Sequence, residues 1–78
     1  MTTTLQILGS GCANCVRLAN NVEAAAKELG MDFELEKVTD FQAIARAGVM
    51  KTPALIVDGQ LKLYGRVPSV EEIKTILA

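Results

Sequence analysis

A helical pattern between two short strand patterns constrains the fold of this chain more than any other feature. Residues 3–8 alternate weakly and run into residues 9–11, Gly-Ser-Gly, which is typical of a strand followed by a turn. Residues 15–30 carry apolar side chains at helical spacing before a terminal glycine, namely Val16, Ala19, Val22, Ala26 and Leu29. Residues 31–38 alternate apolar and charged side chains, as a half-solvated strand does. Two strands joined through a whole helix are expected to be parallel, with a right-handed crossover.

A short second helix is predicted after these strands. Thr39, followed three residues later by Gln42, has the form of a capping box, so the helix is expected to begin there and to end near Ala47. Gly48 is the expected stop. We assign Phe33 and Phe41 to the core, together with the apolar stripe of the first helix.

The last third of the chain predicts a hairpin and a terminal helix. Residues 53–57 and 60–64 flank Asp58-Gly59, a pair that favours a tight two-residue turn between antiparallel strands. Ser69 and Glu72 repeat the capping pattern before an apolar stripe. The predicted order is strand-helix-strand-helix-strand-strand-helix.

Composition narrows the class of protein. The chain has 78 residues, of which 50% are hydrophobic and 22% charged, so we expect a single domain over residues 1–78 with one small core. The net charge is -1 and the basic residues are scattered, which argues against nucleic-acid or membrane partners. Residues 1–8 lack the pattern of a secretory signal, and no apolar run approaches the ~20 residues that span a bilayer. We therefore expect a cytoplasmic protein.

The two cysteines of the chain, Cys12 and Cys15, stand at the predicted start of the first helix. Residues three apart there lie one turn apart on one face, close enough to form a disulfide, and the helix dipole favours a thiolate on the first of them. A bridge across so short a loop adds little stability. In a cytoplasmic protein such a pair is usually redox-active or metal-binding. Cu(I) or Zn(II) suits the thiolates, although two cysteines supply half of a tetrahedral zinc site and the chain has no histidine.

The order of elements, with Cys-x-x-Cys at the first strand-to-helix junction and Thr-Pro before the third strand, resembles the thioredoxin fold in its minimal, glutaredoxin-sized form. More narrowly, the chain looks like the small prokaryotic thioredoxin-like redox-active disulfide proteins. Three segments carry the resemblance: Gly9 to Cys15, Val49 to Leu55, and Tyr64 to Ser69. It implies an α/β fold with a four-stranded mixed sheet and helices on both faces. It also implies a cis peptide bond between Thr52 and Pro53, in a loop that faces the disulfide and pairs with an extended substrate segment.

The resemblance also implies roles for the cysteines. Cys12 is the attacking thiol, expected to be the more exposed and the more acidic, and Cys15 is the resolving thiol. The implied activity is thiol-disulfide exchange with protein disulfides, in a monomer without a bound cofactor. Electrons are expected from a flavin-dependent reductase of the thioredoxin-reductase type. Glutathione is the less favoured donor, because residues 65–69, Gly-Arg-Val-Pro-Ser, replace the Gly-Gly-acidic pattern of glutathione-dependent relatives.

Some positions leave alternatives open. Ala13 and Asn14 replace the Gly-Pro of thioredoxins and the Pro-Tyr of many glutaredoxins, so the reduction potential is not fixed within a family range of about -270 to -120 mV. Lys51 is expected to be a solvated loop residue, with stabilisation of the Cys12 thiolate as the alternative. Val49 and Met50 are compatible both with an apolar docking surface beside the cysteines and with core packing.

Overall fold

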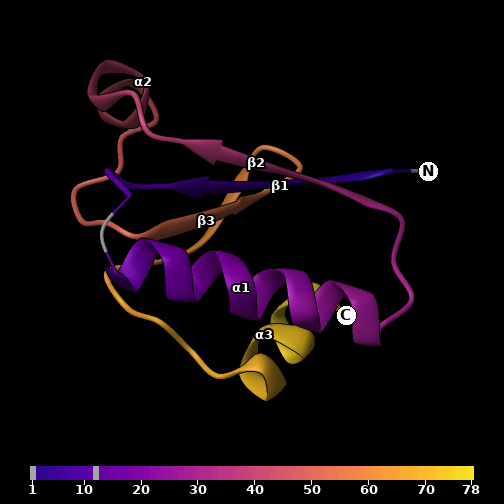
Figure 1. Ribbon diagram of the computed structural model, residues 1–78. Coiled ribbons are helices and arrows are strands. Elements are labelled where there is room, and N and C mark those ends of the chain that lie inside the picture. Colours follow the sequence, from indigo (N-terminus) through magenta and orange to yellow (C-terminus); the bar gives the residue numbers. More distant parts are fainter. Residues whose placement is uncertain (1, 12) are drawn as a thin grey trace.

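The computed structural model describes residues 2–11 and 13–78. Three helices and four strands follow one another along the chain in the predicted order (Figure 1). Their bounds are β1 Thr3–Leu8, α1 Ala13–Glu28, β2 Phe33–Val38, α2 Phe41–Arg46, β3 Ala54–Val57, β4 Gln60–Tyr64 and α3 Val70–Leu77. The helical and period-two patterns of the sequence therefore located every element to within a few residues.

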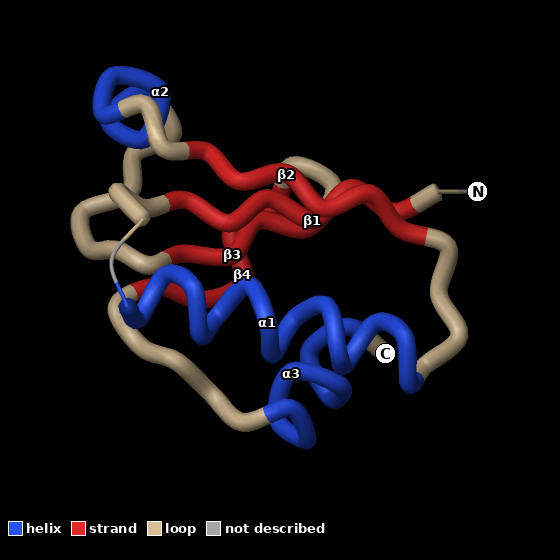
Figure 2. The backbone as a smooth tube through the Cα atoms, in the orientation of Figure 1, coloured by secondary structure: helices blue, strands red, loops and turns tan. Residues whose placement is uncertain are grey.

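The four strands form one mixed sheet in the order β2-β1-β3-β4. β1 and β2 are parallel, with Thr3 opposite Phe33 and Leu8 opposite Val38. β3 is antiparallel to both β1 and β4. The tube view shows β1 between β2 and β3, with α1 and α3 together on one side of the sheet (Figure 2). The predicted mixed sheet and parallel crossover are confirmed.

Apolar side chains cover both faces of this sheet. Because successive side chains of a strand point to opposite faces, Leu5 and Ile7 join the main core with Val22 of α1, whereas Leu8 joins a smaller cluster around Ile44 of α2. Residues 54–57 of β3 divide in the same way between the two clusters. Helices thus pack on both faces, as expected for the minimal thioredoxin fold.

Three core assignments made from the sequence are wrong. Phe41 is 82% exposed, and Val16 and Leu29, at the two ends of the apolar stripe on α1, are 47% and 37% exposed. Helix α2 has only six residues and buries Ile44 alone, and Phe41 at its first position stays exposed. Phe33 is half-buried and does pack against the main core.

The start of α2 also differs from the capping-box prediction. Asp40 is the N-cap, and its carboxylate accepts a hydrogen bond of 3.0 Å from the Gln42 N–H. The cap therefore lies one residue later than Thr39. Both residue types cap helices well, so the pattern alone did not choose between neighbours. The helix ends at Arg46 with Ala47 as its C-cap, and Gly48 follows with a φ of +77°, close to the predicted end.

The hairpin between β3 and β4 turns at Asp58-Gly59, as predicted. Both residues adopt the left-handed conformation, with φ of 48° and 84°, which is the requirement of the tight hairpin turn that this pair favours. Asp58 also exchanges hydrogen bonds of 2.9 Å with Thr4, one through its N–H and one through its carboxylate. The turn is therefore anchored to the central strand β1.

Helix α3 begins at the predicted cap. The Ser69 hydroxyl accepts a hydrogen bond of 3.2 Å from the Glu72 N–H. We expect Ser69→Ala to lower the free energy of unfolding by about 1 kcal/mol, because it leaves that amide without its cap. Urea denaturation followed by circular dichroism measures the loss. Ser10→Ala, at an exposed turn serine, is the control and should change stability by less than about 0.5 kcal/mol; equal losses in the two variants would contradict the capping assignment.

Candidate active site

The turn that joins β1 to α1 carries the candidate site. Gly9 is buried at the end of β1, and its N–H donates a hydrogen bond of 3.0 Å to the Val38 carbonyl. Gly11 has a φ of +88°, a conformation that glycine adopts without strain. Cys12 lies outside the described residues, and with it the predictions about its exposure. Cys15 lies in the first turn of α1, as the sequence predicted.

The Cys15 side chain is buried against Gly9. Its exposed fraction is 5%. A Cβ atom placed on Gly9 would overlap the Cys15 Sγ and would lie 3.3 Å from the Cys15 Cβ. The missing side chain of Gly9 therefore lets the start of α1 lie directly against the end of β1. Sequence reasoning placed Gly9 in a turn but did not foresee this contact, because nothing local signals it.

The Thr52-Pro53 loop borders the same glycine. The peptide bond between these residues is cis, as predicted. Pro53 is buried and Thr52 exposed, and a Cβ on Gly9 would lie 3.8 Å from the Thr52 Cβ. The structure thus brings the loop and Cys15 together at Gly9. Ala13 and Asn14, by contrast, are exposed on the first turn of α1.

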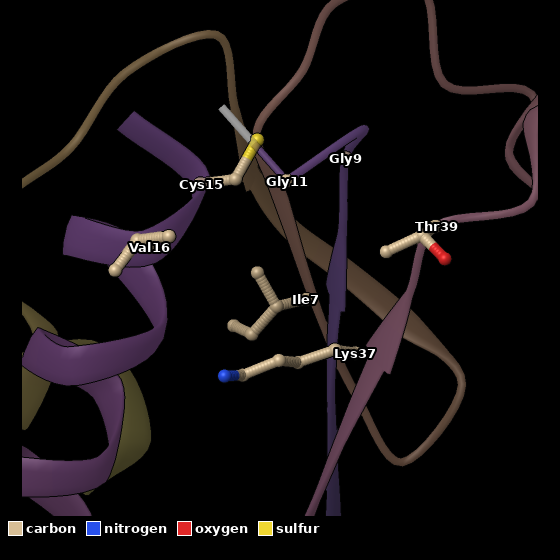
Figure 3. Close-up of a pocket in the computed structure, with 7 residues that line it drawn as sticks. All are labelled: Ile7, Gly9, Gly11, Cys15, Val16, Lys37 and Thr39. Carbon is tan, nitrogen blue, oxygen red and sulfur yellow. The ribbon is translucent and has the colours of Figure 1, made fainter. Parts of the chain in front are cut away.

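A small cavity of about 40 Å³ lies beneath the Cys15 sulfur. Figure 3 shows the residues that line it, which are Ile7, Gly9, Gly11, Cys15, Val16, Lys37 and Thr39. In this view Ile7 lies between the sulfur and the Lys37 side chain, whose ammonium points toward α1. Such a cavity has room for a few waters at most, since a cavity of about 10–15 Å³ on this measure holds one water.

Lys37 lines the cavity, and its charge also lowers the pKa of a glutamate on α1. The pKa of Glu23 on α1 is lowered, mainly by a hydrogen bond from Lys27 and by its charge, and to a smaller extent by the charge of Lys37. Among the residues that line the cavity, Lys37 is the only charged one. The immediate surroundings of the Cys15 sulfur are therefore mostly apolar. Sequence reasoning did not single out Lys37.

Comparison with known proteins identifies the family. The family model described as a thioredoxin domain matches residues 3–78. The chain belongs to the thioredoxin family. It is 53% identical over 74 residues to a thioredoxin of Methanothermobacter thermautotrophicus, covering 95% of this chain and 96% of that protein. It is also 44% identical over 70 residues to a thioredoxin of Methanocaldococcus jannaschii, covering 90% and 80% of the two chains. These relationships support a thiol-disulfide oxidoreductase function.

The chain just after β4, which begins at Gly65, packs beside the Thr52-Pro53 loop. Gly65 has a φ of +74°, and its N–H donates a hydrogen bond of 2.8 Å to the Pro53 carbonyl. A Cβ on Gly65 would lie 3.3 Å from both Cβ and Cδ of Lys51, so the aliphatic part of Lys51 covers this glycine. Gly65 therefore ends β4 and also holds the Pro53 loop in place.

Arg66, the next residue, connects the segment after β4 to α3. Its guanidinium forms an ion pair with the Glu72 carboxylate. The hydrogen bond from Arg66 lowers the pKa of Glu72, and the same bond raises the pKa of Arg66. Both side chains are about half exposed, so the pair orients the loop more than it stabilises the fold.

Within residues 2–11 and 13–78, no three His, Cys, Asp or Glu side chains gather as a metal site would require. None of the helices described is long and apolar enough to cross a membrane. The thioredoxin relatives give no support to the metal-binding alternative.

Proposed function

We propose that this chain exchanges electrons with protein disulfides through Cys12 and Cys15, in the cytoplasm and without a bound cofactor. The observation that carries the proposal is the burial of Cys15 against Gly9, with Thr52 of the Thr52-Pro53 loop beside the same glycine. Because Cys15 is almost fully buried, the first attack on a bulky protein disulfide falls to Cys12 in this proposal. Membership of the thioredoxin family supports the same chemistry.

The proposed reaction has two steps. The Cys12 thiolate attacks one sulfur of the substrate disulfide, forms a mixed disulfide and releases the other substrate sulfur as a thiolate. Cys15, after losing its proton to solvent or to that thiolate, attacks the Cys12 sulfur and expels the second substrate thiolate. The substrate gains two electrons, and the chain is left with a Cys12-Cys15 disulfide. Because Cys15 is buried, it is suited to the second step rather than the first.

Neighbouring residues have supporting roles in this proposal. Thr52 is exposed, and its backbone is proposed to pair with an extended substrate segment beside the reacting sulfurs. Ala13 and Asn14, on the first turn of α1, adjust thiolate stability and hence the reduction potential. A monomer is the proposed working state.

A reductase completes the proposed cycle by returning two electrons to the disulfide. A flavin-dependent enzyme of the thioredoxin-reductase type is the proposed donor. Glutathione is less suited, since residues 65–69 lack the acidic side chain expected to hold its amino group, and Arg66 in that segment is paired with Glu72.

Trapping of the mixed disulfide tests this function. We expect Cys15→Ser to accumulate an adduct with an oxidised protein such as insulin through Cys12, because the resolving thiol is missing. Intact-mass spectrometry before and after reduction detects the adduct. Cys12→Ser is the matched control and should form none. An adduct through Cys15 in that control would reverse the roles, and no adduct in either variant would contradict the function.

A further inference from the structure

The cavity beneath the Cys15 sulfur contains one charged side chain, that of Lys37, which takes no part in the two exchange steps as written. Besides Cys15 and Lys37, the described residues that line the cavity are aliphatic or glycine, with Thr39 as the exception. Thr39 turns its methyl group toward the cavity and its hydroxyl away (Figure 3). Among the described lining residues there is thus no carboxylate to accept the Cys15 proton.

The register of the sheet directs Lys37 toward α1. Lys37 stands opposite Ile7 of the central strand β1, and Ile7 belongs to the core beneath α1. Phe33 and Leu35, which share a face of β2 with Lys37 because side chains alternate along a strand, pack against the same core. Figure 3 shows the Lys37 ammonium pointing toward α1. Lys37 as a whole is exposed, as is usual for a lysine whose stem covers apolar surface.

The charged groups that face Lys37 come from α1. The pKa of Glu23 is lowered first by the hydrogen bond from Lys27 and, in smaller part, by the charge of Lys37. Glu23 is itself paired with Lys27 at 2.9 Å. The acidic residues of β2, Glu34 and Glu36, lie on the other face of that strand. In the part of the chain that the structure describes, no ion pair uses Lys37, so its charge is balanced only at a distance by Glu23.

Cys15 must become a thiolate before it can attack the mixed disulfide. Burial away from water disfavours the ionised form of a thiol, whereas a nearby cation favours it. Ile7 lies between the Cys15 sulfur and Lys37 in Figure 3, and such apolar material screens a charge less than bulk water does. Because Lys37 is also in contact with solvent, water screens part of its charge. We therefore expect an effect of a few-fold on the ionisation of Cys15.

We propose that Lys37 promotes the second exchange step by stabilising the Cys15 thiolate across the cavity. This inference rests on the proposed function and assigns the residue that activates the resolving thiol. The Cys15 S–H bond breaks and water takes the proton; the thiolate then forms a bond to the Cys12 sulfur, and the bond between Cys12 and the substrate sulfur breaks. The departing substrate thiolate is protonated by solvent. Lys37 supplies charge and transfers no proton, so it is a positioning residue that acts through Cys15.

Two sequential thiol releases separate the steps of the reaction. The reduced protein is mixed with a stoichiometric amount of the neutral reagent 4,4'-dithiodipyridine in a stopped-flow spectrophotometer. Attack by Cys12 releases one thiopyridone and leaves a mixed disulfide, and attack by Cys15 releases the second thiopyridone. Only the first phase depends on reagent concentration. The second phase therefore measures the resolving step, and its pH profile follows the ionisation of Cys15.

Substitutions at Lys37 test the charge rather than the shape of the side chain. Lys37→Met should slow the second phase about threefold at neutral pH and move its pH profile upward. At alkaline pH, where Cys15 is ionised in both proteins, the rates should meet or cross, because a thiolate of higher pKa is the better nucleophile. Lys37→Arg keeps the charge and should retain the wild-type profile.

Two further variants check the direction and the position of the effect. Glu23→Gln removes the carboxylate that faces Lys37 and should move the profile downward in pH, opposite to Lys37→Met. Lys62→Met is the matched control, because Lys62 is an exposed lysine on β4, the strand at the other edge of the sheet from β2. It should change neither phase.

The outcomes distinguish this inference from the proposed function. An unchanged pH profile in Lys37→Met, or a second phase that Lys37→Met and Lys37→Arg slow equally at every pH, would overturn the assignment of Lys37. In both cases the wild-type protein still releases two thiopyridones, so the exchange chemistry stands. Release of only one thiopyridone by the wild-type protein would instead overturn the proposed function.

Discussion

Gly9→Ala is expected to slow reduction of bis(2-hydroxyethyl) disulfide about a hundredfold. The new Cβ would overlap the Cys15 Sγ, and the Gly9 backbone cannot readily retreat because its N–H is bonded to the Val38 carbonyl. Cys15 or the first turn of α1 must therefore move. A displacement of about 1 Å in a reacting group costs on the order of a hundredfold in rate. Stopped-flow turnover measurements give the change.

A control variant and a check of folding show whether a lower rate comes from displacement of Cys15. Ser10→Ala alters the next residue of the turn, which is exposed, and should retain nearly the full rate. Overpacking also destabilises proteins by about 1–3 kcal/mol, so the assay must be run at a temperature where Gly9→Ala is shown to be folded. A folded Gly9→Ala protein with the wild-type rate would show that the Gly9 contact does not position Cys15.

Leu55→Ala is expected to produce the largest loss of stability, about 2–5 kcal/mol. Leu55 is fully buried in β3, opposite Ile7 on one side and Leu63 on the other, and it belongs to the core beneath α1 and α3. Removing most of its side chain leaves a cavity in a sheet that has little freedom to collapse. Small domains have only about 5–15 kcal/mol of stability in total. The variant should therefore be partly unfolded near physiological temperature.

Leu61→Ala is the matched control for that prediction. Leu61 occupies the neighbouring strand β4 but is 44% exposed, so its truncation should cost well under half as much free energy. Urea denaturation at equilibrium compares the two variants by their midpoints and slopes. Similar losses at positions 55 and 61 would contradict the assignment of Leu55 to the core.

Local signals explain how much of the fold the sequence predicted. Asp58-Gly59 specifies its turn through two left-handed residues, and Ser69 specifies the start of α3 through one hydrogen bond. Both signals act within a few residues and need no knowledge of the rest of the chain. Phe41 is different, because its exposure depends on whether a distant element covers α2. Helix α2 is too short to bury more than Ile44, which periodicity alone did not reveal.

The candidate site also has some features that the sequence predicts and others that only the fold creates. The spacing of the cysteines and the Thr52-Pro53 dipeptide are visible in the sequence, and the structure brings Cys15 and this loop to one glycine. The contact of Gly9 with Cys15 joins a strand end to a helix, and no pattern along the chain encodes it. Lys37 reaches the same cavity only because β2 lies beside β1 in register.

Redox titration of the purified protein tests the central claim most directly. Samples equilibrated in dithiol-disulfide buffers of graded potential are alkylated and weighed by mass spectrometry, with metal analysis alongside. We predict one reversible two-electron transition between a dithiol and a Cys12-Cys15 disulfide, within about -270 to -120 mV, and no stoichiometric metal. Tight metal binding with no disulfide formed at potentials near about -200 mV would contradict it.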